Sequence, residues 1–252
     1  EKITGVPAQK IKDAARIYGT AKTAMVATGM GMSQQVTGTH NVFSLLNMIL
    51  ITGKIGKERC GIDPPRGQNN VQGATDVGCH PTMYSGYIPI TNTENRQKVA
   101  EVWGVPFERL SDRPGLTTVE IIQAAYHGKI KGLYIMGENP MISDPNLNHT
   151  EEALKKLDFL VVQDIFLTET ARFAHVVLPA SAWAEKNGTF VNSDRRVLRV
   201  RKAVDCPGQA REDWRIIHEL AARMGKPMPN YRDEAEIFDE LARVTPIMAG
   251  IS

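Results

Sequence analysis

The stretch FLVVQDIFLTET, Phe159–Thr170, joins a short continuous apolar run to a polar segment. Three similar apolar runs occur along the chain: TAMVA (23–27), GLYIM (132–136) and HVVLP (175–179). Short uninterrupted apolar runs are typical of strands buried on both faces, and here they alternate with helical patterns. The sequence therefore predicts an α/β fold with a mostly parallel sheet flanked by helices.

Apolar residues at helical spacing predict the helices between these strands. The expected helices are Pro7–Tyr18, Thr39–Ile51, Thr117–His127, Glu151–Leu157, Asp213–Met224 and Glu234–Val244, with a shorter one near Asn95–Trp103. Residues 53–115 are otherwise dense in Gly, Pro, Asn and Asp. So long an irregular segment is usually functional, and we expect a domain change inside it, near Gln68.

Composition indicates an ordinary globular protein. The 252 residues are 42% hydrophobic and carry 30 basic and 28 acidic side chains, for a formal charge of +2. Because no block of like charges occurs, we expect neither a nucleic-acid nor a membrane partner. The longest apolar run, Val42–Ile51, is about half of what a membrane-spanning helix needs. The three scattered cysteines favour a protein of the reducing cytoplasm. Because the first residue is Glu1 rather than Met, we expect this chain to be a piece of a longer protein.

The segment after each apolar run is polar, contains glycine, or both: TGMGMSQQ, GENP, DIFLTET and ASAWAEKNGTFVNSDRR. Ligands of open α/β sheets bind at the carboxyl ends of strands, where glycine lets the backbone approach closely. A carboxylate such as Glu138 or Asp164 can accept two hydrogen bonds from guanine. Together, the four segments that follow the apolar runs predict a nucleotide site, although each segment alone also fits helix capping. GMGMSQ lacks the third glycine of the dinucleotide fingerprint, where Gln34 stands.

The stretch DPPRGQNNVQGATDVG, Asp63–Gly78, holds an arginine in a stiff polar setting. The guanidinium of Arg66 is a planar fork that matches a carboxylate. Two prolines before it stiffen the approach, and Gly67 permits an unusual backbone angle. We therefore predict that Arg66 holds a small organic anion, with a structural ion pair as the alternative. Cys79–His80 has no further ligands nearby, so we expect it to be structural and identify no metal ligand in this sequence.

Six motifs, in this order, resemble a known family: GMGMSQ, ITGKIGK, RGQNNVQGATDVG, YIMGENP, the block from 161 to 196, and DWRIIHELAARMG. The chain is similar to the middle of the catalytic subunit of molybdenum- or tungsten-dependent formate dehydrogenases, in the molybdopterin oxidoreductase superfamily. The resemblance covers nearly the whole chain. Nitrate-reducing relatives typically lack an arginine before the glycine–glutamine pair, so Arg66 is the residue that points to formate.

The resemblance implies a fold and a cofactor. Members have two Rossmann-like α/β domains that each hold one molybdopterin guanine dinucleotide, so residues 1–67 would belong to one domain and residues 68–252 to the second. The pterin side would include Met30, Gln34 and Gln68. The guanosine site would include Gly137, Glu138, Asn139, Gln163, Asp164 and Thr168, with Asp164 reading guanine, and further contacts are expected at Ser181, Gly188 and Asp194.

The resemblance also implies a reaction, the two-electron oxidation of formate to carbon dioxide or its reverse, with Arg66 orienting formate. The molybdenum or tungsten ligand and a 4Fe–4S cluster would lie in parts of the parent outside this chain. Expected partners are the remaining domains of the subunit and iron–sulfur or hydrogenase-type electron-transfer subunits. Two alternatives stay open: a related oxidoreductase such as a nitrate reductase, and a non-catalytic electron-transfer subunit. Arg66, Gln68 and Asp164 together favour the enzyme.

Overall fold

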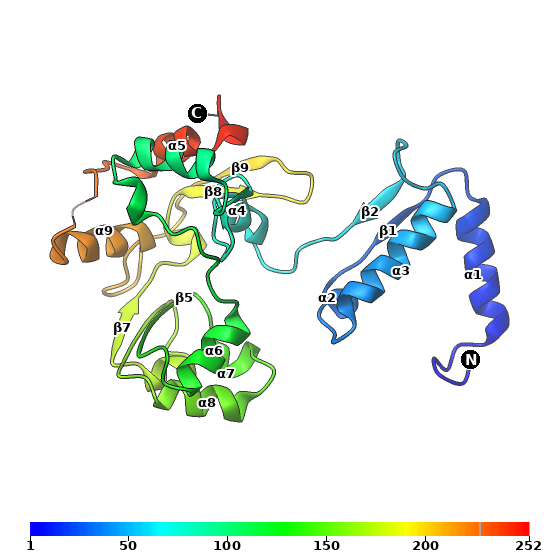
Figure 1. Ribbon diagram of the computed structural model, residues 1–252, viewed down its shortest axis with the longest axis horizontal. Helices are drawn as coiled ribbons and strands as arrows, with labels where there is room; N and C mark the ends of the chain where they lie inside the picture. The colour runs from blue at the N-terminus through cyan, green and yellow to red at the C-terminus, as the bar shows by residue number, and fades with distance from the viewer. Residues whose placement is uncertain (227, 252) are drawn as a thin grey trace. The chain divides into compact units, whose positions relative to one another are not determined.

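The computed structural model describes residues 1–226 and 228–251. The chain divides into two compact units, Glu1–Val71 and Gln72–Ser252. Figure 1 shows the helices and strands of each unit along the chain. Parallel sheets with helices between their strands confirm the predicted α/β class. The assignment of the two parts to two cofactor-binding domains stays a prediction.

The first unit is built on a β–α–β segment. Its elements are α1 (Ala8–Thr20), β1 (Met25–Ala27), α2 (Met30–Ser33), α3 (Gly38–Ile51) and β2 (Gly61–Asp63). Strands β1 and β2 pair in parallel, with Met25 opposite Gly61. Helix α3 ends before Gly53, whose φ of 61° places it in the left-handed region that glycine tolerates. The buried Lys54 then donates a hydrogen bond to the carbonyl of Ala21, which ties the end of α3 to the end of α1.

Strand β2 was not predicted. Its three residues, Gly61–Asp63, contain one large apolar side chain and stand inside the glycine- and proline-rich segment, so no periodic signal marks them. They become a strand because β1 offers a backbone edge to pair with. Residues 64–68, which contain the arginine motif, therefore follow the carboxyl end of a strand. The sequence had placed this motif inside an irregular segment.

The second unit contains a three-stranded parallel sheet in the order β5-β6-β7. Its elements are α6 (Thr118–Tyr126), β5 (Gly132–Met136), α7 (Pro140–Ser143), α8 (Leu147–Lys155), β6 (Phe159–Asp164) and β7 (Val176–Pro179). Helix α6 starts with a capping box between Thr117 and Glu120. Helix α8 starts four residues before the predicted Glu151, because the Asn146 side chain accepts the His149 N–H at 3.2 Å.

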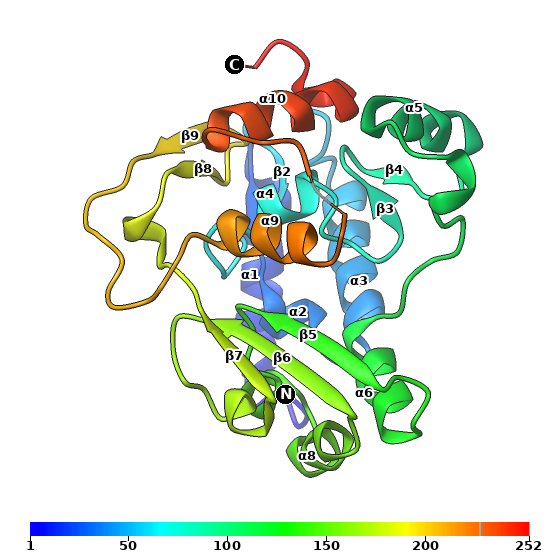
Figure 2. The same ribbon diagram turned by 90° about the vertical axis from the view of Figure 1, so that its left-hand side faces the viewer.

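Helices α6 and α8 lie on one side of this sheet and α9 (Asp213–Arg223) lies on the other (Figures 1 and 2). The core cluster on the α6 and α8 side includes Ile135, Leu154, Leu160 and Val162. Only the central strand β6 is buried over both faces. The expectation that all four apolar runs are buried on both faces was wrong for β1, β5 and β7, since in this chain each pairs along only one edge.

The rest of the second unit is less regular. It contains α4 (Val71–Asp76), β3 (Met83–Tyr84), β4 (Ile88–Pro89), α5 (Thr93–Trp103), β8 (Gly188–Val191), β9 (Val197–Val200), α10 (Glu234–Val244) and four short 3₁₀ turns at Phe107–Arg109, Thr170–Phe173, Trp183–Glu185 and Pro246–Met248. Residues 53–115 are thus more regular than predicted, and β8 and β9 form an unpredicted antiparallel hairpin. None of the described helices has the length and hydropathy needed to cross a membrane.

Candidate functional site

The first unit brings two predicted motifs to one edge of a sheet. Because β1 and β2 are parallel, their carboxyl ends meet, and the Thr28 N–H donates to the Asp63 carbonyl at 3.0 Å just beyond them. Met30 begins the helix after β1, and Gln34 caps it. Arg66 and Gln68 follow β2 within five residues. The two predicted motifs that contain these four residues therefore follow the carboxyl ends of two neighbouring strands.

The two loops also touch. A Cβ built on Gly67 would lie 3.6 Å from the Met30 methyl carbon, an ordinary contact distance. Asn70 has φ of 59°, so the chain turns sharply just after the arginine. The Arg66 side chain is exposed, and no ion pair among the described residues includes it. The anion-binding role of Arg66 and its alternative, a structural ion pair, therefore both stay predictions.

In the second unit a cavity of about 440 Å³ opens at the carboxyl end of the β5-β6-β7 sheet. The residues lining it are Met136, Gly137, Gln163, Asp164, Ile165, Phe166, Ala180, Ser181, Ala182, Trp183, Lys186 and Asp213. Of the predicted guanosine-site residues, the structure brings Gly137, Gln163, Asp164 and Ser181 together there. Sequence reasoning missed Trp183, Lys186 and Asp213.

A chain of hydrogen bonds forms the buried side of this cavity. Gln163 is 0% exposed. Its Nε2 donates to Asp213 Oδ1 at 2.7 Å, and its Oε1 accepts from the Tyr134 hydroxyl. The other oxygen of Asp213 pairs with the Lys186 ammonium. Gln163 therefore links the sheet to the start of α9, with both ends of its carboxamide engaged.

The hydroxyl of Tyr134 is an ionisable group of this hydrogen-bonded chain, and its surroundings shift its pKa. Burial raises the pKa of Tyr134, and the negative charge of Asp213 raises it further. Tyr134 therefore keeps its proton and acts as a donor to Gln163 over the whole neutral range.

Asp164 stands at the end of β6 and lines the cavity. Its Oδ1 accepts the Phe166 N–H at 3.0 Å, which closes a tight turn after the strand. Among the described residues this is the one hydrogen bond recorded for the carboxylate. Oδ2 is therefore left to accept a hydrogen bond from a ligand.

Ser181 follows β7 and is 3% exposed. Its Oγ has no hydrogen-bond partner among the described residues, although it lines the cavity. A buried hydroxyl without a partner costs roughly 1–3 kcal/mol. A polar ligand in the cavity would supply the missing partner.

The remaining predicted residues lie outside this cavity. Glu138 accepts the Ser143 hydroxyl at 2.5 Å. Asn139 donates to Glu169 at 2.9 Å and accepts from the Thr170 hydroxyl at 2.7 Å, so it fastens the loop after β5 to the loop after β6. This bond from Asn139 lowers the pKa of Glu169. The other three are Thr168, whose hydroxyl accepts the Ala171 N–H at 3.2 Å, and Gly188 and Asp194 in the β8–β9 hairpin.

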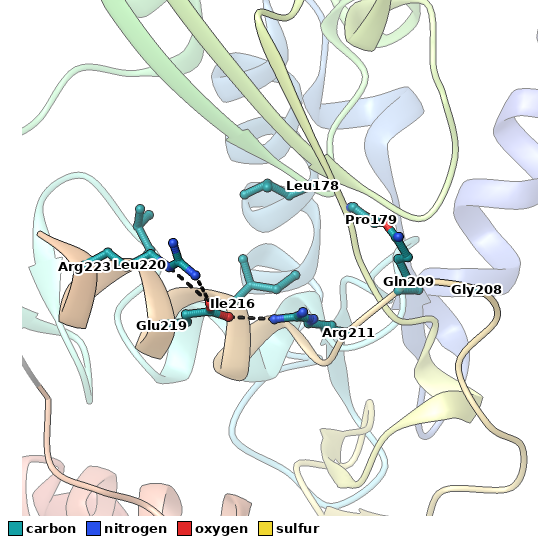
Figure 3. Close-up of a pocket in the computed structure, with 10 residues that line it drawn as sticks. Leu178, Pro179, Gly208, Gln209, Arg211, Ile216, Glu219, Leu220 and Arg223 are labelled. Carbon is teal, nitrogen blue, oxygen red and sulfur yellow. Dashed lines mark hydrogen bonds and ion pairs between the residues drawn. The ribbon is translucent and has the colours of Figure 1, made fainter.

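A second cavity of about 650 Å³ lies between β7 and α9 (Figure 3). Leu178, Ile216 and Leu220 form part of its wall. Its charged residues pair with one another, since Glu219 accepts from Arg211 at 2.6 Å and from Arg223 at 2.7 Å. Those two arginines lower the pKa of Glu219, Arg223 more strongly. None of the predicted site residues lines this cavity, so the smaller cavity is the better candidate site despite its size.

The sequence and the fold match a known family. Residues 9–223 match the family described as molybdopterin oxidoreductase, and the chain belongs to it. In fold, the chain resembles acetylene hydratase from Pelobacter acetylenicus, with a TM-score of 0.67, 19% identity, and 96% of this chain and 36% of that chain covered. That likeness confirms the architecture.

Relatives of higher identity carry specific descriptions. The F420-dependent formate dehydrogenase subunit alpha of Methanocaldococcus jannaschii is 50% identical over 100% of this chain and 37% of its own length. The corresponding subunit of formate dehydrogenase 1 from Methanococcus maripaludis is 46% identical over 100% and 36%. Formate dehydrogenase H of Escherichia coli is 43% identical over 99% and 34%. The chain thus spans about a third of the length of these relatives.

Proposed function

We propose that this chain is part of the catalytic subunit of a formate dehydrogenase, which interconverts formate and carbon dioxide at a molybdenum or tungsten centre. The observation that carries the proposal is Arg66, exposed and without an ionic partner among the described residues, at the strand edge where Met30, Gln34 and Gln68 also lie. Relatives with 43% and 50% identity that are described as formate dehydrogenases support it.

Arg66 suits formate for a chemical reason. Formate is a small planar carboxylate, and a guanidinium donates two parallel hydrogen bonds to such a group. Lysine offers a point charge of the same sign without the planar fork. In the proposed reaction Arg66 binds and orients the carboxylate, which places its C–H bond for oxidation.

The proposed cofactor is a pair of molybdopterin guanine dinucleotides. The second-unit cavity fits a nucleotide because Ser181 Oγ has no partner among the described residues, and a Cβ on Gly137 would meet none of their atoms within 4 Å. Asp164 would accept from guanine, while Met30, Gln34 and Gln68 would bind the pterin side. When bound, the metal and its pterins supply the acceptor for two electrons.

The larger assembly is also part of the proposal. Residues 1–67 and 68–252 would each contribute to one of the two cofactor-binding domains. The remaining domains of the subunit would supply the metal ligand and a 4Fe–4S cluster, and iron–sulfur or hydrogenase-type subunits would receive electrons. We propose the cytoplasm as the place of action.

The test is formate oxidation by the full-length subunit carrying Arg66→Lys. Loss of a charge-assisted bidentate contact is expected to lower kcat/KM for formate by roughly tenfold to a hundredfold, with metal and pterin content unchanged. The matched control is Arg59→Lys, an exposed arginine of the same unit paired with its neighbour Glu58. A wild-type kcat/KM for Arg66→Lys would refute the orienting role, and reduction of nitrate without formate activity would refute the substrate.

A further inference from the structure

Helices α6 and α8 bring two histidines to one carboxamide. Both helices pack on the same core cluster, α6 through Ile122 and α8 through Leu154, which fixes their relative position (Figures 1 and 2). Gln123 lies on α6, and its Nε2 is 2.8 Å from the Nε2 of His127, at the end of the same helix. Its Oε1 is 3.0 Å from the Nε2 of His149, on α8. Two imidazole nitrogens from two helices therefore converge on one amide group.

The hydrogen-bonding roles of these three side chains follow from the carboxamide. A carboxamide nitrogen only donates and its oxygen only accepts, so His127 Nε2 accepts from Gln123 and His149 Nε2 donates to it. His127 is therefore neutral in this arrangement, with the lone pair of its Nε2 directed at the amide group. A neutral imidazole with such a lone pair is the form of histidine that binds metal ions.

The ring of Tyr126 contacts both imidazoles. Its centre lies 4.3 Å from the centre of the His149 ring and 5.3 Å from that of His127. Lys156 holds this tyrosine in turn, since its Nζ lies 3.5 Å from the centre of the ring and donates to the Tyr126 carbonyl at 3.1 Å. The two imidazoles are thus oriented by packing before any ligand binds, which lowers the entropy that binding costs.

The distances suit a metal ion. Zn²⁺ binds imidazole nitrogen at about 2.0–2.1 Å, so two ligand atoms on one ion lie about 3–3.4 Å apart. The 3.0 Å between His149 Nε2 and Gln123 Oε1 falls in this range, and His127 Nε2 is 2.8 Å from the same amide group. Small side-chain movements would therefore place all three groups around one ion. Imidazole nitrogens suit Zn²⁺, Ni²⁺ and Cu²⁺, whereas Mg²⁺ and Ca²⁺ prefer oxygen ligands.

We propose that His127, His149 and the carboxamide oxygen of Gln123 bind a divalent transition cation such as Zn²⁺, which cross-links α6 to α8. None of the three lines the cavity at the end of the β5-β6-β7 sheet, and the proposal does not depend on the proposed function. Among the described residues no three His, Cys, Asp or Glu side chains are grouped to hold a metal, so the third protein ligand here is an amide and water completes the coordination. Spacing in sequence does not show the site, since His149 is 26 residues from Gln123.

The experiment is equilibrium dialysis of the full-length subunit, with its cofactors in place, against Zn²⁺. His127→Asn and His149→Asn are each expected to lower the affinity for one equivalent of Zn²⁺ by at least about tenfold, since loss of even an outer partner of a metal ligand costs about 10–100-fold. Gln123→Glu is expected to raise that affinity by roughly tenfold, because a carboxylate adds negative charge to the ligand set. Excess Mg²⁺ should not displace the bound Zn²⁺.

The control and the choice of variants separate a metal ligand from a folding effect. His40→Asn removes an exposed histidine of the first unit and should leave the affinity for Zn²⁺ unchanged. His127 is exposed at the end of its helix, so its variant should fold even where His149→Asn does not. Tighter binding by Gln123→Glu cannot come from a damaged fold, and it would support the site directly. Equal Zn²⁺ affinity in the unmodified subunit and His127→Asn, or no Zn²⁺ binding by the unmodified subunit, would overturn the proposal.

Discussion

Replacing Asp213 with alanine tests the hydrogen-bonded chain behind the cavity. The change removes the acceptor of the Gln163 Nε2 bond, 2.7 Å long, and the partner of Lys186. A hydrogen bond to a charged group contributes about 1.5–3 kcal/mol, and the Gln163 side chain that loses its acceptor is 0% exposed in the folded chain. The Lys186 pair adds only about 0.5–1 kcal/mol, since the two side chains are 31% and 26% exposed. We expect the free energy of unfolding to fall by about 2–4 kcal/mol.

Urea unfolding followed by tryptophan fluorescence measures this change, because Trp214 is the next residue along α9. Asp205→Ala is the control: Asp205 is 95% exposed and pairs with Lys202 at 2.7 Å, so its loss should stay within about 0.5 kcal/mol. Asp213→Asn should fall between the two, since it keeps an acceptor oxygen but no charge. A loss for Asp213→Ala no larger than that of the control would refute the supporting role of the carboxylate.

Two further predictions concern the second unit. Leu154 is 2% exposed in the core cluster, so Leu154→Ala should lower the free energy of unfolding, measured in urea, by about 2–5 kcal/mol. The control is Leu198→Ala at a half-exposed position, and a smaller loss for Leu154→Ala than for this control would contradict the described core. Burial, and after it the hydrogen bond to Glu240, raises the pKa of Tyr231 from 10.0 to about 12. Because the folded protein then holds the proton more tightly than the unfolded chain, this contribution to stability is complete below about pH 10 and is lost as pH rises toward about 12. Tyr231→Phe should remove that dependence in alkaline unfolding curves, and an unchanged dependence would contradict it.

The parts of the fold that were predicted have local signals. Leu160, Val161 and Val162 are consecutive apolar residues, and all three are buried in β6. Helix α6 carries its own start signal in Thr117 and Glu120. Such signals involve neighbours in sequence, so they can be recognised before any tertiary contact is known.

The β8–β9 hairpin had a weaker signal that was not used. The turn NSDR at residues 192–195 separates two short β-prone runs, GTFV and VLRV. In the structure the Asn192 side chain accepts the Arg196 N–H at 2.9 Å, and Arg195 has φ of 62°. An Asn-containing turn between such runs is typical of a hairpin.

Gln163 shows why the candidate site was only partly predictable. Side chains alternate along a strand, so Leu160 and Val162 face the core while Gln163 faces α9, where it bonds to Asp213. The sequence predicts Gln163 as a guanosine-site residue, and the structure places it in the wall of the cavity, while the guanosine role stays a prediction. Its partner Asp213 is 50 residues away in sequence, and an acidic residue at a helix start is locally typical of a favourable helix charge. Since both ends of its carboxamide are engaged, Gln163 acts first as a support. The cavity groups that keep an unused hydrogen-bonding position among the described residues are then the Asp164 carboxylate and the Ser181 hydroxyl.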